Sequence, residues 1–110
     1  MQKIKKKITR KDAISLAKKY IEQCRQMNVT IQKAILFGSV STGTAHNNSD
    51  IDLLLVSTMF KNNSLDNWKM LAPVTALLFE VEPHPYPYAN FIKGDSFIDE
   101  IKKTGIEIKI

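Results

Sequence analysis

Two aspartates at the start of an apolar stretch constrain the fold of this chain more than any other feature. Asp50 and Asp52 flank Ile51, and four aliphatic residues, 53–56, follow them. A run of this kind is typical of a buried strand, in which residues two apart point to the same face. The two carboxylates therefore project side by side, where they repel each other and lose hydration. Because a divalent cation relieves both costs, the pattern indicates a metal site at the beginning of this strand.

A glycine-containing turn precedes the two aspartates. The short apolar run 33–37 is typical of a buried strand, and it stops at Gly38-Ser39, with ten residues between Ser39 and Asp50. Glycine lets the backbone approach a ligand, and free N–H groups together with the Ser39 hydroxyl can hold a phosphate. Asp-x-Asp alone is equally compatible with two solvated aspartates at a strand edge. The added turn favours phosphoryl or nucleotidyl transfer, which needs both a metal and a phosphate site.

Gly-Ser, ten residues and then Asp-x-Asp resembles the signature of the DNA polymerase β-like nucleotidyltransferase superfamily. The chain is most similar to the minimal nucleotidyltransferases of bacteria and archaea, which are stand-alone domains of about this length. The resemblance implies an α/β (α+β) fold with a mixed β-sheet packed with helices. It also implies a triphosphate beside the turn formed by Gly38, Ser39, Thr42 and Gly43, and one or two Mg²⁺ ions on Asp50 and Asp52.

The resemblance further implies a third carboxylate from a later strand. The candidates are Glu80 and Glu82, which are two apart and therefore share a face of a strand predicted over residues 77–82. We favour Glu82, because it lies at the end of that strand, where active sites of α/β sheets gather. Minimal members of the family more often have aspartate there. The predicted catalytic residues are thus Asp50, Asp52 and Glu82, and Glu80 is an alternative metal ligand.

The implied reaction transfers a nucleotide, AMP from ATP, to an acceptor hydroxyl. Minimal nucleotidyltransferases are frequently paired with a HEPN-type ribonuclease toxin, and some act as antitoxins by adding AMP to a tyrosine of that partner. Two alternatives stay open: a non-catalytic module that binds a nucleotide or a partner, and a transferase for small molecules of the aminoglycoside type. The second usually carries an added helical domain. The sequence leaves open whether the chain forms a homo-oligomer.

The length of 110 residues predicts a single domain over residues 1–110. No segment is long and apolar enough to be a signal peptide or a membrane span, so we expect a cytoplasmic protein. Of the net charge of +5, residues 1–25 carry +7 and the remainder −2. No aromatic residues are interleaved with these lysines, so we expect a solvated helix face rather than a nucleic-acid interface. The single Cys24 lies on an apolar helix stripe, which indicates a buried structural thiol.

The remaining elements follow from periodicity and from capping residues. We expect a helix from the cap Thr9 to about residue 28, a helix from residue 65 or 66 that Pro73 kinks or divides, a helix capped by Asp95 or Ser96, and a strand over 106–110. The segment 83–87 is predicted to be irregular because of its three prolines.

Several aromatic and histidine side chains receive only weak predictions. Trp68 is expected to face the core, and Phe97, Ile98 and Ile101 to form the inner face of the last helix. His46 and His84 are candidates to contact phosphates or to donate protons, but a surface position near a turn is favoured for each. Tyr86 and Tyr88 either rigidify the proline-rich segment or stack on a base.

Overall fold

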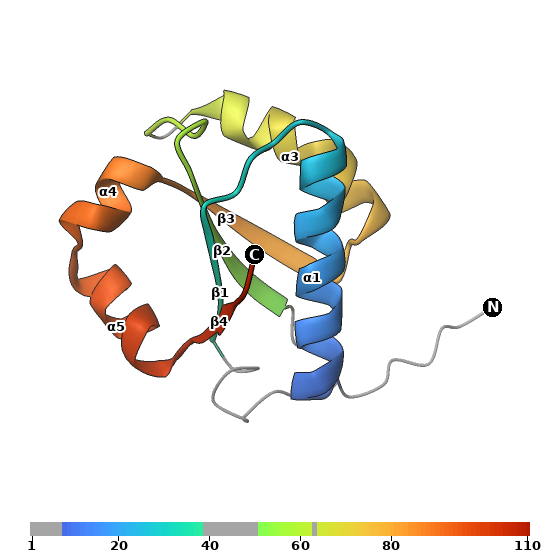
Figure 1. Ribbon diagram of the computed structural model, residues 1–110, viewed down its shortest axis with the longest axis horizontal. Coiled ribbons are helices and arrows are strands. Elements are labelled where there is room, and N and C mark those ends of the chain that lie inside the picture. The colour runs from blue at the N-terminus through green and yellow to red at the C-terminus, as the bar shows by residue number, and fades with distance from the viewer. Residues whose placement is uncertain (1–7, 39–50, 63) are drawn as a thin grey trace.

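A four-stranded mixed sheet forms the centre of the molecule, in a computed structural model that describes residues 8–38, 51–62 and 64–110 (Figure 1). Its strands are β1 (Lys33–Phe37), β2 (Ile51–Ser57), β3 (Val81–Pro87) and β4 (Ile106–Ile108), in the spatial order β3-β2-β1-β4. β1 is antiparallel to β2 and to β4, whereas β2 and β3 are parallel. The predicted mixed sheet packed with helices is confirmed.

Helices cover both faces of this sheet. α1 (Arg10–Gln26) and α3 (Leu65–Leu77) lie on one side, and α4 (Tyr88–Lys93) and α5 (Ser96–Thr104) on the other (Figure 1). Along β2, Ile51, Leu53 and Leu55 pack in the core shared with α1 and α3, whereas Leu54 and Val56 pack in the core shared with α4 and α5. A strand buried on both faces needs a continuous apolar run, which is what residues 53–56 supply. By the same alternation, Asp52 falls on the α4 and α5 side of the sheet.

The first helix matches its prediction closely. Thr9 is its cap, and the Thr9 hydroxyl accepts a hydrogen bond from the Asp12 backbone N–H at 3.0 Å. Its inner face is formed by five buried residues: Ala13, Ala17, Tyr20, Ile21 and Cys24. Burial raises the pKa of Cys24 to about 12, so the thiol stays neutral and unreactive at physiological pH. The prediction of a structural cysteine is confirmed.

The third strand differs from its prediction. The segment expected as a strand, 77–82, holds the last residue of α3, a turn and only the first two residues of β3. The segment expected to be irregular, 83–87, forms the rest of β3. The Ile51 N–H donates to the Glu80 carbonyl oxygen at 3.0 Å, so the even-numbered residues of β3 turn their backbone groups toward β2. The three prolines are odd-numbered and lie at the outer side of this edge strand, where a missing N–H removes no ladder hydrogen bond. The irregular assignment was wrong because it considered the number of prolines and not their spacing.

The second described helix also corrects the sequence analysis. Pro73 lies inside α3, which runs as one element, so the expectation that Pro73 divides this helix is wrong. Trp68 is 51% exposed instead of facing the core. The inner face of α3 carries Asn67, Leu71 and Val74, so Trp68 points away from it. The buried Asn67 amide bonds in both directions to the backbone of Lys61, at 2.9 Å and 2.6 Å. This pair joins the beginning of α3 to the segment after β2.

The C-terminal part adds one unpredicted helix and confirms the next. The short α4 follows β3 directly and has no side-chain cap. Asp95 caps α5 by accepting from the Ile98 N–H at 2.8 Å, and Ile98 and Ile101 are buried as predicted, whereas Phe97 is 45% exposed. The Tyr86 hydroxyl also donates to Asp95, which ties β3 to the start of α5. β4 is shorter than the predicted strand over 106–110.

No helix in the described ranges is both long and apolar enough to cross a membrane.

The junction between α5 and β4 generates a stability prediction. A Cβ atom at Gly105 would lie 2.5 Å from Ile35 Cγ2, 2.6 Å from the Ile101 carbonyl oxygen and 2.8 Å from the Leu36 carbonyl oxygen. Because two of these neighbours are backbone atoms, Gly105→Ala must displace α5 or β1, and we expect it to lower the free energy of unfolding by about 1–3 kcal/mol. Urea denaturation measures this loss. Lys103→Ala, an exposed change two residues away, should shift the value by less than about 0.5 kcal/mol, and an equal loss in both variants would contradict the packing argument.

Candidate functional site

The ends of three neighbouring strands, β1, β2 and β3, meet at one end of the sheet. Asp52 pairs in register with Phe37 of β1 on one side and with Glu82 of β3 on the other. Asp52 and Glu82 are therefore direct neighbours on adjacent parallel strands, and both are the second residue of their strand. Glu82 was expected at the carboxyl end of its strand, and this placement was wrong. The site lies at the carboxyl end of β1 and at the amino ends of β2 and β3.

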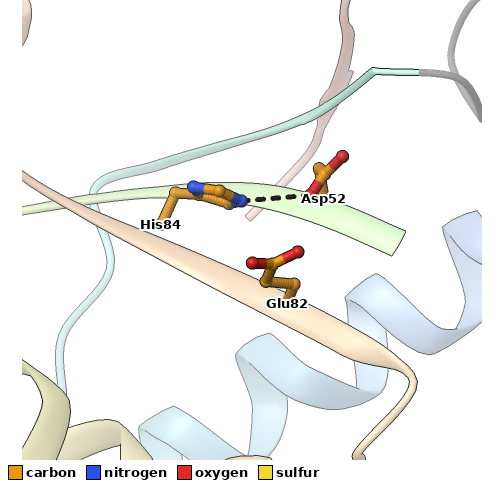
Figure 2. Close-up of side chains that lie close together, drawn as sticks. All are labelled: Asp52, Glu82 and His84. Atoms are coloured by element: carbon orange, nitrogen blue, oxygen red, sulfur yellow. Dashed lines mark hydrogen bonds and ion pairs between the residues drawn. The ribbon is translucent and has the colours of Figure 1, made fainter. Parts of the chain in front are cut away.

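His84 joins these two carboxylates. It follows Glu82 by two residues, so both side chains are on the same face of β3. The His84 Nε2 atom lies 3.1 Å from Asp52 Oδ1, and Figure 2 shows the three side chains gathered over β2 and β3. The two hydrogen-bonded side chains are partly exposed, His84 by 33% and Asp52 by 27%, so the cluster is open to a ligand from solvent.

The sequence analysis favoured a surface position near a turn for His84 over contact with phosphates or proton donation, and it did not group His84 with the carboxylates. The signal that could have found it is the alternation Glu82-x-His84, which has the same two-residue spacing as Asp50-x-Asp52. That signal was lost because residues 83–87 were not considered as a strand.

The cluster has the composition and the size of a metal site. Asp52, Glu82 and His84 each offer one ligand atom, and these atoms all lie within 4.8 Å of one another. No other group of three or more such side chains occurs among the residues that the structure describes. Carboxylate oxygens and an imidazole nitrogen are common ligands of divalent cations, so the donor set fits such an ion.

The two glutamates proposed as the third carboxylate are separated by the structure. Glu82 belongs to the cluster, whereas Glu80 lies in the turn before β3 and is not among its members. Of the two candidates, it is therefore Glu82 that β3 brings to Asp52.

Gly38 closes the cluster on the side of β1. It has a φ of +79°, which favours glycine, and a Cβ atom built on it would lie 2.6 Å from Asp52 Oδ2. The backbone of the turn therefore runs directly against the Asp52 carboxylate. Its predicted close approach to a phosphate stays a prediction. The other predicted residues of the site, Asp50, Ser39, Thr42 and Gly43, lie outside the described residues, as does His46.

Aromatic rings line one side of the cluster. The Phe37 ring contacts the His84 ring edge to face, with centroids 4.8 Å apart, and the Phe97 ring lies 5.7 Å from Phe37 and 6.2 Å from Tyr86. These contacts explain why Phe97 stays at the surface, since its ring covers Phe37 and not the core beneath α5. Burial, followed by the hydrogen bond to Asp95, raises the pKa of Tyr86 to about 12, so its hydroxyl remains a donor at neutral pH.

Comparisons with known proteins agree with this arrangement. The family described as a nucleotidyltransferase domain matches residues 17–108. A crystal structure of a candidate nucleotidyltransferase from Sulfolobus solfataricus superposes with a TM-score of 0.63 at 20% sequence identity, covering 89% of this chain and 80% of that chain. At this identity the likeness establishes the fold. No curated protein matches the chain in sequence.

The family match covers most of the chain and includes the Gly38 turn, Asp52 and Glu82. The chain therefore belongs to the nucleotidyltransferase domain family.

Proposed function

We propose that this protein is a metal-dependent nucleotidyltransferase that transfers AMP from ATP to an acceptor hydroxyl. The observation that carries the proposal is the pairing of Asp52 with Glu82 on adjacent strands, directly against the Gly38 turn. One ligand oxygen of each carboxylate lies within 4.8 Å of the other. Two negative charges this close repel each other unless a cation lies between them. The family match supports nucleotidyl transfer as the chemistry, and the choice of ATP rests on the resemblance to minimal nucleotidyltransferases.

The residues of the chain hold and orient the reactants. Asp52 and Glu82 would hold Mg²⁺, with Asp50 as a further ligand expected from the sequence. A bound divalent cation neutralises negative charge on the phosphates and lowers the pKa of the attacking hydroxyl. The backbone at Gly38 can approach the triphosphate because glycine presents no side chain there.

The reaction is a single displacement at phosphorus. The acceptor oxygen forms a bond to the α-phosphorus while the bond from that phosphorus to the bridging oxygen breaks. Pyrophosphate leaves with the electron pair of the broken bond, and the proton of the acceptor hydroxyl passes to solvent. The donors at the site act mainly by position and charge, because this displacement needs no covalent intermediate on the protein.

A tyrosine of a HEPN-domain partner is the proposed acceptor, which would make this protein an antitoxin. This part rests on the resemblance. On α3, Leu65 and Trp68 are three residues apart, so they lie on one side of the helix, and they are 74% and 51% exposed. This exposed apolar pair supports contact with a protein partner.

Removing one carboxylate tests the metal and nucleotide site. We expect calorimetry to show ATP binding that depends on Mg²⁺ in the wild type and is weakened at least about tenfold in Asp52→Asn, because the amide cannot replace a charged ligand. We expect Asp50→Asn to weaken Mg²⁺-dependent ATP binding to a similar extent. Glu107→Gln is the control, since this carboxylate is on β4 and pairs with Lys33 at 3.3 Å, away from the cluster. Equal ATP affinity with and without Mg²⁺ would contradict the proposal.

Two glycines with a positive φ test the role of the turn. Gly38 and Gly94 have φ angles of +79° and +78°, so alanine is strained at both positions, by about 1–3 kcal/mol. A Cβ at Gly94 would lie 4.0 Å from its nearest neighbour, whereas a Cβ at Gly38 would collide with Asp52. We expect thermal unfolding to show a loss of stability in both Gly38→Ala and Gly94→Ala, and calorimetry to show weaker Mg²⁺-ATP binding for Gly38→Ala alone. Equal ATP binding by both variants would show that the close approach at Gly38 is not needed.

The proposed acceptor requires a HEPN-domain protein encoded beside this chain, and mass spectrometry of such a protein tests it. With Mg²⁺ and ATP, we expect the partner to gain the mass of one AMP on a tyrosine, and the Asp52→Asn variant to lower this rate at least about a hundredfold. If this protein binds Mg²⁺-ATP but the HEPN-domain partner stays unmodified, the proposed acceptor is wrong. That result would not contradict nucleotidyl transfer to another acceptor.

A further inference from the structure

We propose that His84 is a ligand of the metal, and that this nitrogen makes the site prefer a first-row transition ion such as Mn²⁺ over Mg²⁺. The inference deepens the proposed function and rests on it, because it requires that Asp52 and Glu82 hold a metal. It concerns which ion is held and which third side chain holds it.

The distance between the Asp52 and His84 ligand atoms fits a shared metal ion. His84 Nε2 lies 3.1 Å from Asp52 Oδ1. Two ligands that occupy neighbouring corners of an octahedron, each about 2.1 Å from the ion, are about 3.0 Å apart. The pair therefore already has the spacing of two ligands of one ion.

The pairing of β2 with β3 holds the three side chains of the cluster together. Glu82 and His84 share one face of β3, and the parallel register places Asp52 opposite Glu82 and Leu54 opposite His84. The three side chains reach the cluster from two hydrogen-bonded strands and require no loop to close. The Phe37 ring, 4.8 Å from the imidazole, supports the orientation of the His84 ring. A ligand set fixed on strands keeps its geometry better than one on loops.

The imidazole nitrogen in the donor set favours a transition ion over Mg²⁺. Mg²⁺ favours oxygen ligands and retains much of its water. Imidazole nitrogen binds transition ions more strongly, and affinity rises along the series from Mn²⁺ to Cu²⁺. A site with two carboxylates and one imidazole therefore gains affinity for Mn²⁺ that it does not gain for Mg²⁺.

A second role for His84 competes with this one. The imidazole could only position Asp52 through the hydrogen bond between them and never contact the ion. Removing such a positioning residue would lower the affinity for both ions by the same factor. A ligand affects the two ions unequally, so the ratio of the Mn²⁺ and Mg²⁺ affinities separates the two roles.

The experiment measures Mn²⁺ and Mg²⁺ binding without nucleotide, by calorimetry, on wild type, His84→Gln and Tyr86→Phe. The glutamine amide can still donate a hydrogen bond to Asp52 but is a weak ligand, and Tyr86 is on the same face of β3 outside the cluster. We expect His84→Gln to lower the Mn²⁺ affinity at least about tenfold and the Mg²⁺ affinity by less than about threefold. Tyr86→Phe should leave the ratio unchanged. Circular dichroism verifies that each variant is folded.

Pulsed electron paramagnetic resonance on the Mn²⁺ complex gives a second readout. Echo modulation from a coordinated imidazole nitrogen should be present in the wild type and absent in His84→Gln. An unchanged affinity ratio, or no nitrogen modulation in the wild type, would overturn the proposal for His84 while Mg²⁺-dependent ATP binding still upheld the proposed function. A wild type that binds neither ion, with or without ATP, would overturn both.

Discussion

The burial of β2 on both faces is the constraint on which the rest of this structure depends. Its apolar residues fill two cores at once, one with α1 and α3 and the other with α4 and α5. A shift of one residue in its pairing would exchange the two sets of side chains and break both cores, so the register is fixed. That register places Asp52 between Phe37 and Glu82. The position of the charged cluster is therefore a consequence of hydrophobic packing several residues away.

Much of the fold was predictable because local rules and tertiary packing agree. The Thr9 cap, the apolar stripe of α1 and the Asp95 cap each have a local cause, and all three appear in the structure. Trp68 was misplaced because α3 is apolar around most of its circumference, so its periodicity does not identify an inner face. Its buried polar residue, Asn67, is explained only by the contact with Lys61, which the sequence does not reveal.

The candidate site was predictable in part, for a similar reason. The spacing of Gly38-Ser39 and Asp50-x-Asp52 is a local pattern, and the described members of it, Gly38 and Asp52, lie against each other. The participation of Glu82 and His84 depends on which strand pairs with β2 and in which direction. A parallel neighbour was not deducible for a segment in which every second residue is proline, since prolines are usually depleted in strands.

The same prolines have a consequence for assembly. An added strand needs backbone donors along the edge that it joins, yet Pro83, Pro85 and Pro87 have none, and the Val81 N–H is already bonded to the Leu78 carbonyl oxygen at 3.0 Å. This side of the sheet is thus closed to β-augmentation and to the edge-to-edge association that leads to aggregation. β2 and β3, which carry Asp52 and Glu82, can therefore lie near solvent without pairing with a strand of another chain. A protein that docks here must therefore use side chains and helices, not main-chain pairing with β3.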